Sequence, residues 1–295
     1  MIYSASNVIA LKEYNDSLYY FKRHLLYLII GIIVLISMIK IDIKYIYKYT
    51  LHFFLISFLL LILVLIPGIG KESGGARSWI SFGFIQFQPS EFMKIALIML
   101  ISKILSSKVH LEFEAKVFFF CLVLIIIVFG LIMLQPDFGS GLVLFISTLI
   151  LLYLSGINIK YFLCLSVMAI FALAFLIVSA PYRLERIMSY LNPWNDPLGS
   201  GFQSIQSLFA TIPGALFGHG FNNSIQKHFF LPEPQNDFIF AIVLEEFGLI
   251  GGTFLILIYL LIINRAFIIS RNINDYYFEE NKEILFKRFF FLKIN

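Results

Sequence analysis

The chain has 295 residues, of which 60% are hydrophobic and only 14% are charged, and its mean hydropathy is +0.89. Ordinary soluble domains have roughly 25% charged residues, so this composition excludes a water-soluble protein and indicates an integral membrane protein. The net charge of +4 comes without a basic stripe interleaved with aromatic residues, so a nucleic-acid partner has no support.

Long apolar runs dominate the chain from its first quarter to its last. Several of them approach the roughly 20 residues that a helix needs to cross a bilayer. Because unpaired backbone polar groups are not tolerated in lipid, and the alternating pattern of a β-barrel is absent, these runs must be helices. We predict an all-α, polytopic helical bundle with seven transmembrane helices. The apolar runs cover residues 24–39, 51–66, 92–106, 117–134, 138–154, 161–179 and 238–264.

The distribution of Lys and Arg over the loops predicts the orientation. Loops that alternate along the chain form two sets, one on each side of the membrane. The set with fewer residues in total contains 13 Lys and Arg residues, and the other set contains 8. By the positive-inside rule the first set is cytoplasmic, so the long segment 180–237 faces outward. The cytoplasmic set comprises residues 40–50, 103–116, 156–162 and 265–295.

Both ends of the chain indicate a longer protein. Seven spans and a cytoplasmic C-terminus place the N-terminus outside, yet the first 20 residues contain no signal peptide and no apolar span. The C-terminal stretch is basic and aromatic, and we interpret it as read-through after truncation rather than as a helix on the membrane surface. We therefore expect a single transmembrane domain over residues 1–271 and a divergent tail over residues 272–295.

The first outward loop, residues 67–94, is rich in Gly and runs into a helix start at Pro89. Glu91 and Lys94 are three positions apart and therefore share one helix face. Arg77 is the best anion-binding candidate of this loop, and a charge on a more deeply buried Lys94 would be costly unless it were paired or used. An ordinary interfacial ion pair within an aromatic belt is an equal alternative.

Two further outward loops interrupt the apolar pattern. In residues 134–145 a Pro-Asp-x-Gly sequence predicts a tight hairpin in which Asp137 caps the following helix. In residues 181–210 a charged stretch that includes Arg186 precedes a turn rich in Pro, Asp and Gly, and a short amphipathic helix follows. Such a long outward loop is uncommon without a functional reason.

The stretch "LPEPQNDFIFAIVLEE", from Leu231 to Glu246, places three acids against apolar sequence. Asp237 lies where polar sequence changes to apolar, so a helix N-cap and a site residue are equal alternatives. Glu245 and Glu246 lie roughly 12 to 14 Å farther along the helix. Acids at that depth usually face a bundle interior or a water-filled cavity, although one of them could simply pair with Lys94 or an Arg of the third loop.

Four loop motifs carry a resemblance to a known family. These are "GGARSWISFGFIQFQPSEFMK", "QPDFGSGLVLF", "NPWNDPLGSGFQSIQSL" and "GHGFNNSIQKHFFLPEPQNDFIFAIVLEEFGLIGG". In this order and spacing, from residue 2 to about 271, the chain resembles the FtsW/RodA/SpoVE (SEDS) family, and its motifs are more similar to the FtsW/SpoVE branch. The family has ten transmembrane helices, and "MIYSAS" resembles the end of the first, so the resemblance implies that the first helix and the last two are missing.

The resemblance implies an enzyme. Members of the family are peptidoglycan glycosyltransferases that polymerise lipid II at the outer face of the bacterial cytoplasmic membrane, for cell division or cell shape. They work with a class B penicillin-binding transpeptidase and with other membrane proteins of the division or elongation machinery. The family's essential Asp corresponds to Asp237, although Gln235 and Asn236 replace the His-Thr that precedes it in the family pattern.

In this family reaction a sugar 4-hydroxyl attacks an anomeric carbon that carries a lipid pyrophosphate. A carboxylate near that hydroxyl can act as general base, and the resemblance implies this role for Asp237. Charge develops on the departing pyrophosphate, which calls for cationic groups or for a divalent ion such as Mg²⁺ or Mn²⁺. Glu91 would orient Lys94 or hold such an ion. The candidate cationic residues are Arg77, Lys94, Arg186 and Lys227, and the acids expected to support the site from around it are Asp137, Glu233, Glu245 and Glu246.

Two other functions are compatible with the sequence. A flippase or transporter of lipid-linked precursors would also carry intramembrane acids around a cavity between helices. A non-catalytic scaffold for a transpeptidase is the third hypothesis, since the chain lacks both ends of the family pattern. No nucleotide-binding loop is found, which argues against nucleotide hydrolysis within this chain.

Overall fold

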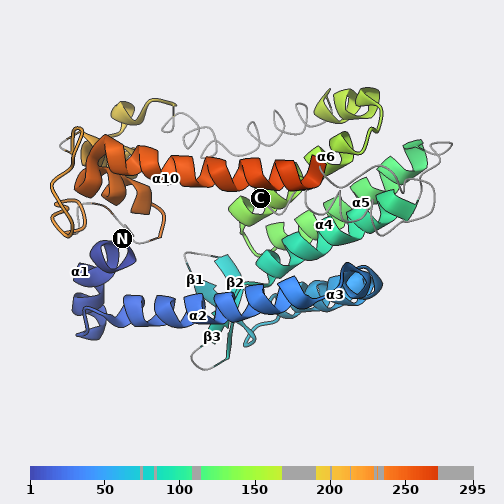
Figure 1. The fold of residues 1–295 in the computed structure, drawn as a ribbon, viewed down its shortest axis with the longest axis horizontal. Coiled ribbons are helices and arrows are strands. Elements are labelled where there is room, and N and C mark those ends of the chain that lie inside the picture. The colour runs from blue at the N-terminus through green and yellow to red at the C-terminus, as the bar shows by residue number, and fades with distance from the viewer. Residues whose placement is uncertain are drawn as a thin grey trace. The chain divides into compact units, whose positions relative to one another are not determined.

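A computed structural model describes most of the chain (Figure 1). The described residues are 1–73, 76–82, 85–107, 114–167, 191–199, 201–212, 214–228, 231 and 236–271. They divide into two compact units, and each is described by itself. The first unit is drawn from Met1–Lys40 and Ala169–Leu261, and the second from Ile41–Met168 and Ile262–Asn295.

In the first unit two helices at the N-terminus pack against each other. Helix α1, Ile2–Tyr14, ends at Asn15 in the left-handed conformation, and α2, Tyr19–Lys40, follows after a short turn. Asp16 stabilises the turn, because its carboxylate accepts hydrogen bonds from the Leu18 amide at 2.9 Å and from the Lys22 ammonium at 2.8 Å. The hydrogen bond from Lys22 lowers the pKa of Asp16 below its ordinary value.

Three elements distant in the sequence share the core of the first unit. These are α1, the short helix α9, Phe202–Thr211, and the first part of the long helix α10, Ile239–Arg271. Small side chains allow the close approach, since Ala5 of α1, Ala210 of α9 and Ala241 of α10 are all buried in one cluster. Phe238 and Ile239 pack against the same cluster. A short 3₁₀ helix, η2, Pro193–Asn195, lies beside α9.

The second unit is a helical layer with one small sheet. Its helices are α3, Ile43–Leu63, α4, Pro89–Ser107, α5, Glu114–Met133, and α6, Phe138–Leu154, and they enclose a continuous apolar core. Between α3 and α4 three antiparallel strands follow one another in order: β1, Gly70–Ser73, β2, Ala76–Phe82, and β3, Ile85–Phe87. The loop predicted over residues 67–91 is therefore largely a β-meander that leads into α4.

Six of the seven predicted apolar runs lie on the described helices α2, α3, α4, α5, α6 and α10. The seventh, 161–179, begins in residues 159–167, which are helical, and then leaves the described part of the chain. Within the described ranges four helices are long and apolar enough to cross a membrane, namely those at Tyr19–Lys40, Ile43–Leu63, Ala115–Met133 and Ile239–Ile269. The shorter apolar helix Phe138–Leu154 adds a fifth apolar element, so the prediction of a helical membrane protein is confirmed.

Candidate functional site

Asp237 lies two residues before the start of α10. The side chain is exposed, whereas Phe238 and Ile239, which follow it, pack into the core of the first unit. Helix α10 begins at Ile239, and no hydrogen bond or ion pair joins the Asp237 carboxylate to the described residues. Asp237 is thus not the N-cap of the described helix, and its exposed side chain precedes two partly buried residues that pack against the core of the first unit.

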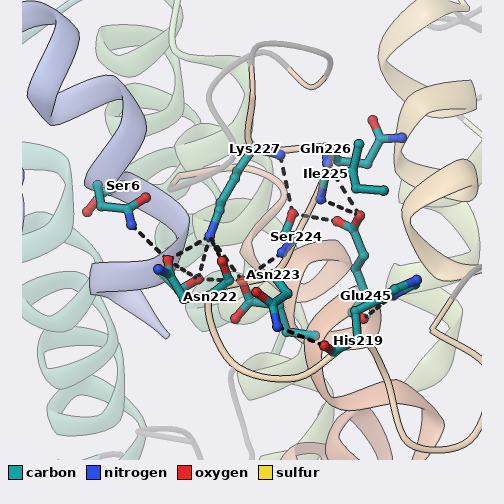
Figure 2. Close-up of polar contacts among 12 residues, drawn as sticks. Ser6, His219, Asn222, Asn223, Ser224, Ile225, Gln226, Lys227 and Glu245 are labelled. Atoms are coloured by element: carbon teal, nitrogen blue, oxygen red, sulfur yellow. Dashed lines mark hydrogen bonds and ion pairs between the residues drawn. The ribbon is translucent and has the colours of Figure 1, made fainter.

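Glu245 lies two turns into α10 and anchors the loop that precedes the helix. Its side chain is 1% exposed. The carboxylate accepts hydrogen bonds from the Ser224 hydroxyl, from the Ile225 amide at 2.7 Å and from the Gln226 amide at 3.3 Å. Figure 2 shows these three residues converging on the Glu245 side chain. A buried carboxylate is tolerated here because backbone and hydroxyl donors replace its water.

Glu246 and Lys227 form an ion pair in the same buried region. They are 0% and 2% exposed, and the Lys227 Nζ lies 3.4 Å from the Glu246 Oε1. The Ser4 hydroxyl of α1 donates to that same oxygen, and the Ser224 amide donates to it at 3.3 Å. Glu246 therefore joins α1 and the loop to α10.

The ammonium of Lys227 is occupied by internal acceptors. It donates to the carbonyl oxygen and to the Oδ1 of Asn222, each at 2.7 Å (Figure 2). It also donates to the Ser4 hydroxyl at 3.3 Å. Asn7 of α1 donates to the same Asn222 Oδ1 at 2.7 Å. This burial leaves no donor for a substrate anion, so we assign Lys227 a structural role in place of the predicted anion binding. Among the described residues the basic partner of Glu246 is Lys227, and the Arg residues of the third loop, Arg183 and Arg186, lie outside the described part of the chain.

A break in α10 follows directly after the two acids. Gly248 has φ 65° and ψ −166°, outside the helical region. Residues 215–220 supply hydrogen-bond partners to the backbone groups at this break. The His219 and Gly220 amides donate to the Glu245 and Glu246 carbonyls at 3.0 and 2.9 Å. In return, the Leu249 and Ile250 amides donate to the carbonyls of residues 215 and 216 at 2.9 and 3.2 Å. Two bonds of an uninterrupted helix are thereby replaced by four bonds to residues 215–220.

Glycine is required at this crossing. A Cβ on Gly248 would lie 2.4 Å from the Leu216 carbonyl oxygen, and a Cβ on Gly218 would lie 2.2 Å from the Glu246 carbonyl oxygen. Both residues also have positive φ, which glycine adopts without the steric penalty of a side chain. The positive φ and the close approach of Leu216 therefore explain why the residue two positions after Glu246 is glycine.

In the second unit the predicted pair forms at the start of α4. The Lys94 Nζ lies 2.7 Å from the Glu91 Oε1. The Glu91 side chain is about half exposed, and Lys94 is less so. Since neither group is deeply buried, this pair adds little to stability, and Glu91 can hold the ammonium of Lys94 in one direction.

Asp137 caps α6, as predicted. Its carboxylate accepts from the Ser140 amide at 3.1 Å, and the side chain of Gln88, just before α4, donates to it at 2.6 Å. The cap thereby ties the start of α6 to the start of α4, which carries Glu91 and Lys94.

The remaining predicted residues are placed as follows. Arg77 lies on β2, half-buried and opposite Glu72 of β1 in the strand register. Arg186 and Glu233 lie outside the described residues. Within the described part of the chain no group of three or more His, Cys, Asp or Glu side chains could hold a metal ion.

The sequence reasoning missed the small polar residues around the buried acids: Ser4 and Ser224 donate to the acids, and Asn222 accepts from Lys227 and from Asn7. Their positions in α1 and in the loop around residues 222–227 gave no sign that they would meet two residues of α10. The sequence indicated these partners only indirectly, because two adjacent acids in an apolar run need hydrogen-bond donors from another part of the chain.

Comparisons with known proteins agree on one family. The family model described as "Cell cycle protein", FtsW/RodA/SpoVE, matches residues 1–281. The chain is 44% identical to stage V sporulation protein E of Bacillus subtilis over 278 residues, which cover 94% of this chain and 76% of that protein. It is 42% identical to the probable peptidoglycan glycosyltransferase FtsW of Coxiella burnetii, with 92% of this chain and 73% of that protein covered.

Solved structures share the fold. A chain from a peptidoglycan synthase complex that coordinates polymerization and crosslinking matches with a TM-score of 0.67 and 27% identity, over 98% of this chain and 78% of that one. The rod shape determining protein RodA of Thermus thermophilus matches in fold with a TM-score of 0.61 at 22% identity, over 99% of this chain and 76% of that one. The described helices and these neighbours make the protein a multi-pass membrane protein. With 281 residues matched by the family model, the chain belongs to the FtsW/RodA/SpoVE family.

Proposed function

We propose that this chain is a peptidoglycan glycosyltransferase that polymerises lipid II at the outer face of the bacterial cytoplasmic membrane, with Asp237 as its general base. The observation that carries the proposal is the state of Asp237. It is an exposed carboxylate without a partner among the described residues, at the start of a helix whose next two residues are packed. The names of the relatives supply the reaction class.

The proposed step forms one bond and breaks one. The 4-hydroxyl oxygen of one sugar bonds to the anomeric carbon of the other, while the bond from that carbon to the pyrophosphate oxygen breaks and its electron pair leaves with the pyrophosphate. The hydroxyl proton passes to the Asp237 carboxylate. A positioned general base of this kind contributes about 10² to 10⁴-fold to a rate.

The pyrophosphate requires positive charge as it departs. We assign this role to Lys94, which Glu91 orients at 2.7 Å, and to Arg77. Arg186 stays a candidate from the sequence, and Lys227 is left out because its ammonium is occupied. The described residues offer no metal-binding cluster, so no step is assigned to Mg²⁺ or Mn²⁺.

We further propose a class B penicillin-binding transpeptidase as the partner, with other division or elongation proteins of the membrane around it. The support is the structural likeness to a chain of a synthase complex that couples polymerization to crosslinking.

The test is strand synthesis from purified lipid II by the full chain with its transpeptidase, resolved on a gel. We expect strands from the wild type and a loss of about 10² to 10⁴-fold in rate from Asp237→Asn, since the amide cannot take the proton. Asp42→Asn is the matched control, because Asp42 caps α3 and Asn caps equally well.

Two results would contradict the proposal. No strands from the wild type would refute polymerisation by this chain. Undiminished strands from Asp237→Asn would refute the role of Asp237 alone and would leave polymerisation standing.

A further inference from the structure

We propose that residues 191–217 rest in the outer leaflet of the bilayer, with the C-terminal end of α9 and the stretch 212–217 against lipid acyl chains. The sequence assigned this stretch to a long outward loop. The proposal concerns a membrane-binding surface and does not depend on the proposed chemistry.

The stretch has the composition of a lipid-contacting segment. From residue 191 to residue 226 the sequence contains one acidic residue, Asp196, and no Lys or Arg. The carboxylate of Asp196 accepts a hydrogen bond from the Gly199 amide at 3.1 Å, so it serves the turn. A water-facing loop of this length would ordinarily carry several charges.

Large apolar side chains are exposed along the described part of this stretch. At the C-terminal end of α9 and just after it, Leu208, Phe209 and Ile212 are exposed, and Ile212 is 69% exposed, whereas Ile205, one turn earlier on the same side, is buried. Phe217 is 77% exposed. The exposed apolar surface therefore begins at Leu208 and continues into the stretch 212–217. The other exposed members are Leu191, Trp194, Leu198 and Leu216.

The break in α10 sets the depth of the stretch. The 16 residues from Leu249 to Asn264, after which the predicted cytoplasmic segment begins, extend over about 24 Å at 1.5 Å per residue, which is most of the roughly 30 Å hydrocarbon core. Counted from that cytoplasmic end, Gly248 lies in the outer part of the core, about 6 Å from its boundary. Residues 215–220 exchange four backbone hydrogen bonds with residues 245–250, so they lie at the same depth.

Lipid is the occupant that this geometry favours. Leu216 and Phe217 adjoin Leu249 and Ile250, which are 59% and 53% exposed at the start of the membrane-crossing part of α10. The apolar surface of the stretch therefore continues the surface that a spanning helix presents to acyl chains. Trp194 contacts Phe209 edge to face at 6.0 Å, and Trp is enriched at the level of the lipid head groups.

Fluorescence quenching by brominated lipids tests the proposal. The chain has two Trp residues, so Trp79→Phe leaves Trp194 as the reporter. The full chain is placed alone in phosphatidylcholine–phosphatidylglycerol vesicles with bromines near the head-group end or near the methyl end of the acyl chains. We expect a loss of Trp194 emission that is larger with the shallow bromines, and little quenching by iodide in the water.

Other outcomes would overturn the proposal. Emission that is equal with and without bromines places Trp194 in water or under protein, and iodide quenching distinguishes these two cases. Stronger quenching by the deep bromines would place Trp194 in the bilayer centre. If Trp79→Phe does not fold, the emission of the wild type minus that of Trp194→Phe isolates the same signal.

A second reporter addresses the end of the stretch. Phe217→Trp, in a chain with Trp79→Phe and Trp194→Phe, should lose emission with the shallow bromines. Lys160→Trp in the same background is the matched control, because Lys160 is exposed at the start of a helix, in the segment 156–162 that is predicted to face the cytoplasm. Equal responses of the two reporters would contradict the proposal.

Discussion

Glu246 joins three segments that are far apart in the sequence. Its carboxylate receives the Ser4 hydroxyl from α1, the Ser224 amide from the loop and the Lys227 ammonium. Because all of these groups are buried, each depends on the others for the hydrogen bonds that water would otherwise supply. This single side chain therefore fixes where α1 and the loop 222–227 lie on α10.

Replacing one member of the buried Lys227–Glu246 pair should lower the free energy of unfolding more than its share of the loss when both members are replaced. Lys227→Met leaves Glu246 buried without its cation, and we expect a loss of about 3 to 5 kcal/mol in the free energy of unfolding. Glu246→Gln should also destabilise, and the double variant should lose less than the sum of the two single losses. Denaturant unfolding in detergent measures all three.

Lys22→Met is the matched control for this cycle. Lys22 also pairs with an acid, Asp16, at 2.8 Å, but both side chains are well exposed. The expected loss is at most about 1 kcal/mol. Additive losses at Lys227 and Glu246 would show that the two groups do not act as a pair.

At the scale of an element, α10 is two helices joined at Gly248. The first, from Ile239, follows directly on Asp237 and carries the two buried acids, and the second continues as an apolar helix to Arg271. Residues 215–220 satisfy the backbone groups that the break exposes, which a membrane environment requires.

Gly248→Ala should therefore destabilise the protein. The added Cβ would meet the Leu216 carbonyl oxygen at 2.4 Å, and Ala would be held at φ 65°. A non-glycine residue in such a conformation costs about 1 to 3 kcal/mol, and the clash adds to this. Thermal unfolding in detergent should show a clearly lower midpoint than for the wild type.

Gly31→Ala in α2 serves as the comparison. A Cβ there meets nothing within 4 Å, and Ala favours a helix over Gly, so the midpoint should stay or rise. If the two variants unfolded alike, the close crossing at Gly248 would not constrain the fold.

At the scale of the whole molecule, the loop charges predict which ends of the helices face the cytoplasm. Residues 67–91 should lie outside and residues 156–162 inside. In a chain with Cys164→Ala, a membrane-impermeant thiol reagent applied to intact spheroplasts should label Lys71→Cys and leave Lys160→Cys unlabelled until the membrane is opened. Both positions are exposed, so accessibility within the protein does not separate them. Labelling of Lys160→Cys alone would reverse the orientation.

Residues near one another in the sequence were predicted well. Asp137 lies three positions before the amide that it caps, and Glu91 lies three positions before Lys94, so helix geometry alone decides these contacts. The same local reasoning failed to find the partners of Glu245 and Glu246. Their donors come from positions 19 or more residues away, and the Ser4 hydroxyl comes from 242 positions away.

The sequence by itself determined that this is a helical membrane protein, where its apolar helices lie and which family it belongs to, because apolar length and ordered loop motifs are properties of the chain. Only the tertiary structure decided that Lys227 is buried against Glu246, that α10 breaks at Gly248 and that the carboxylate of Asp237 is exposed beside packed residues. These features depend on which distant backbone and side-chain groups meet, because a buried polar group needs a donor or acceptor and the sequence does not show which distant residue supplies it.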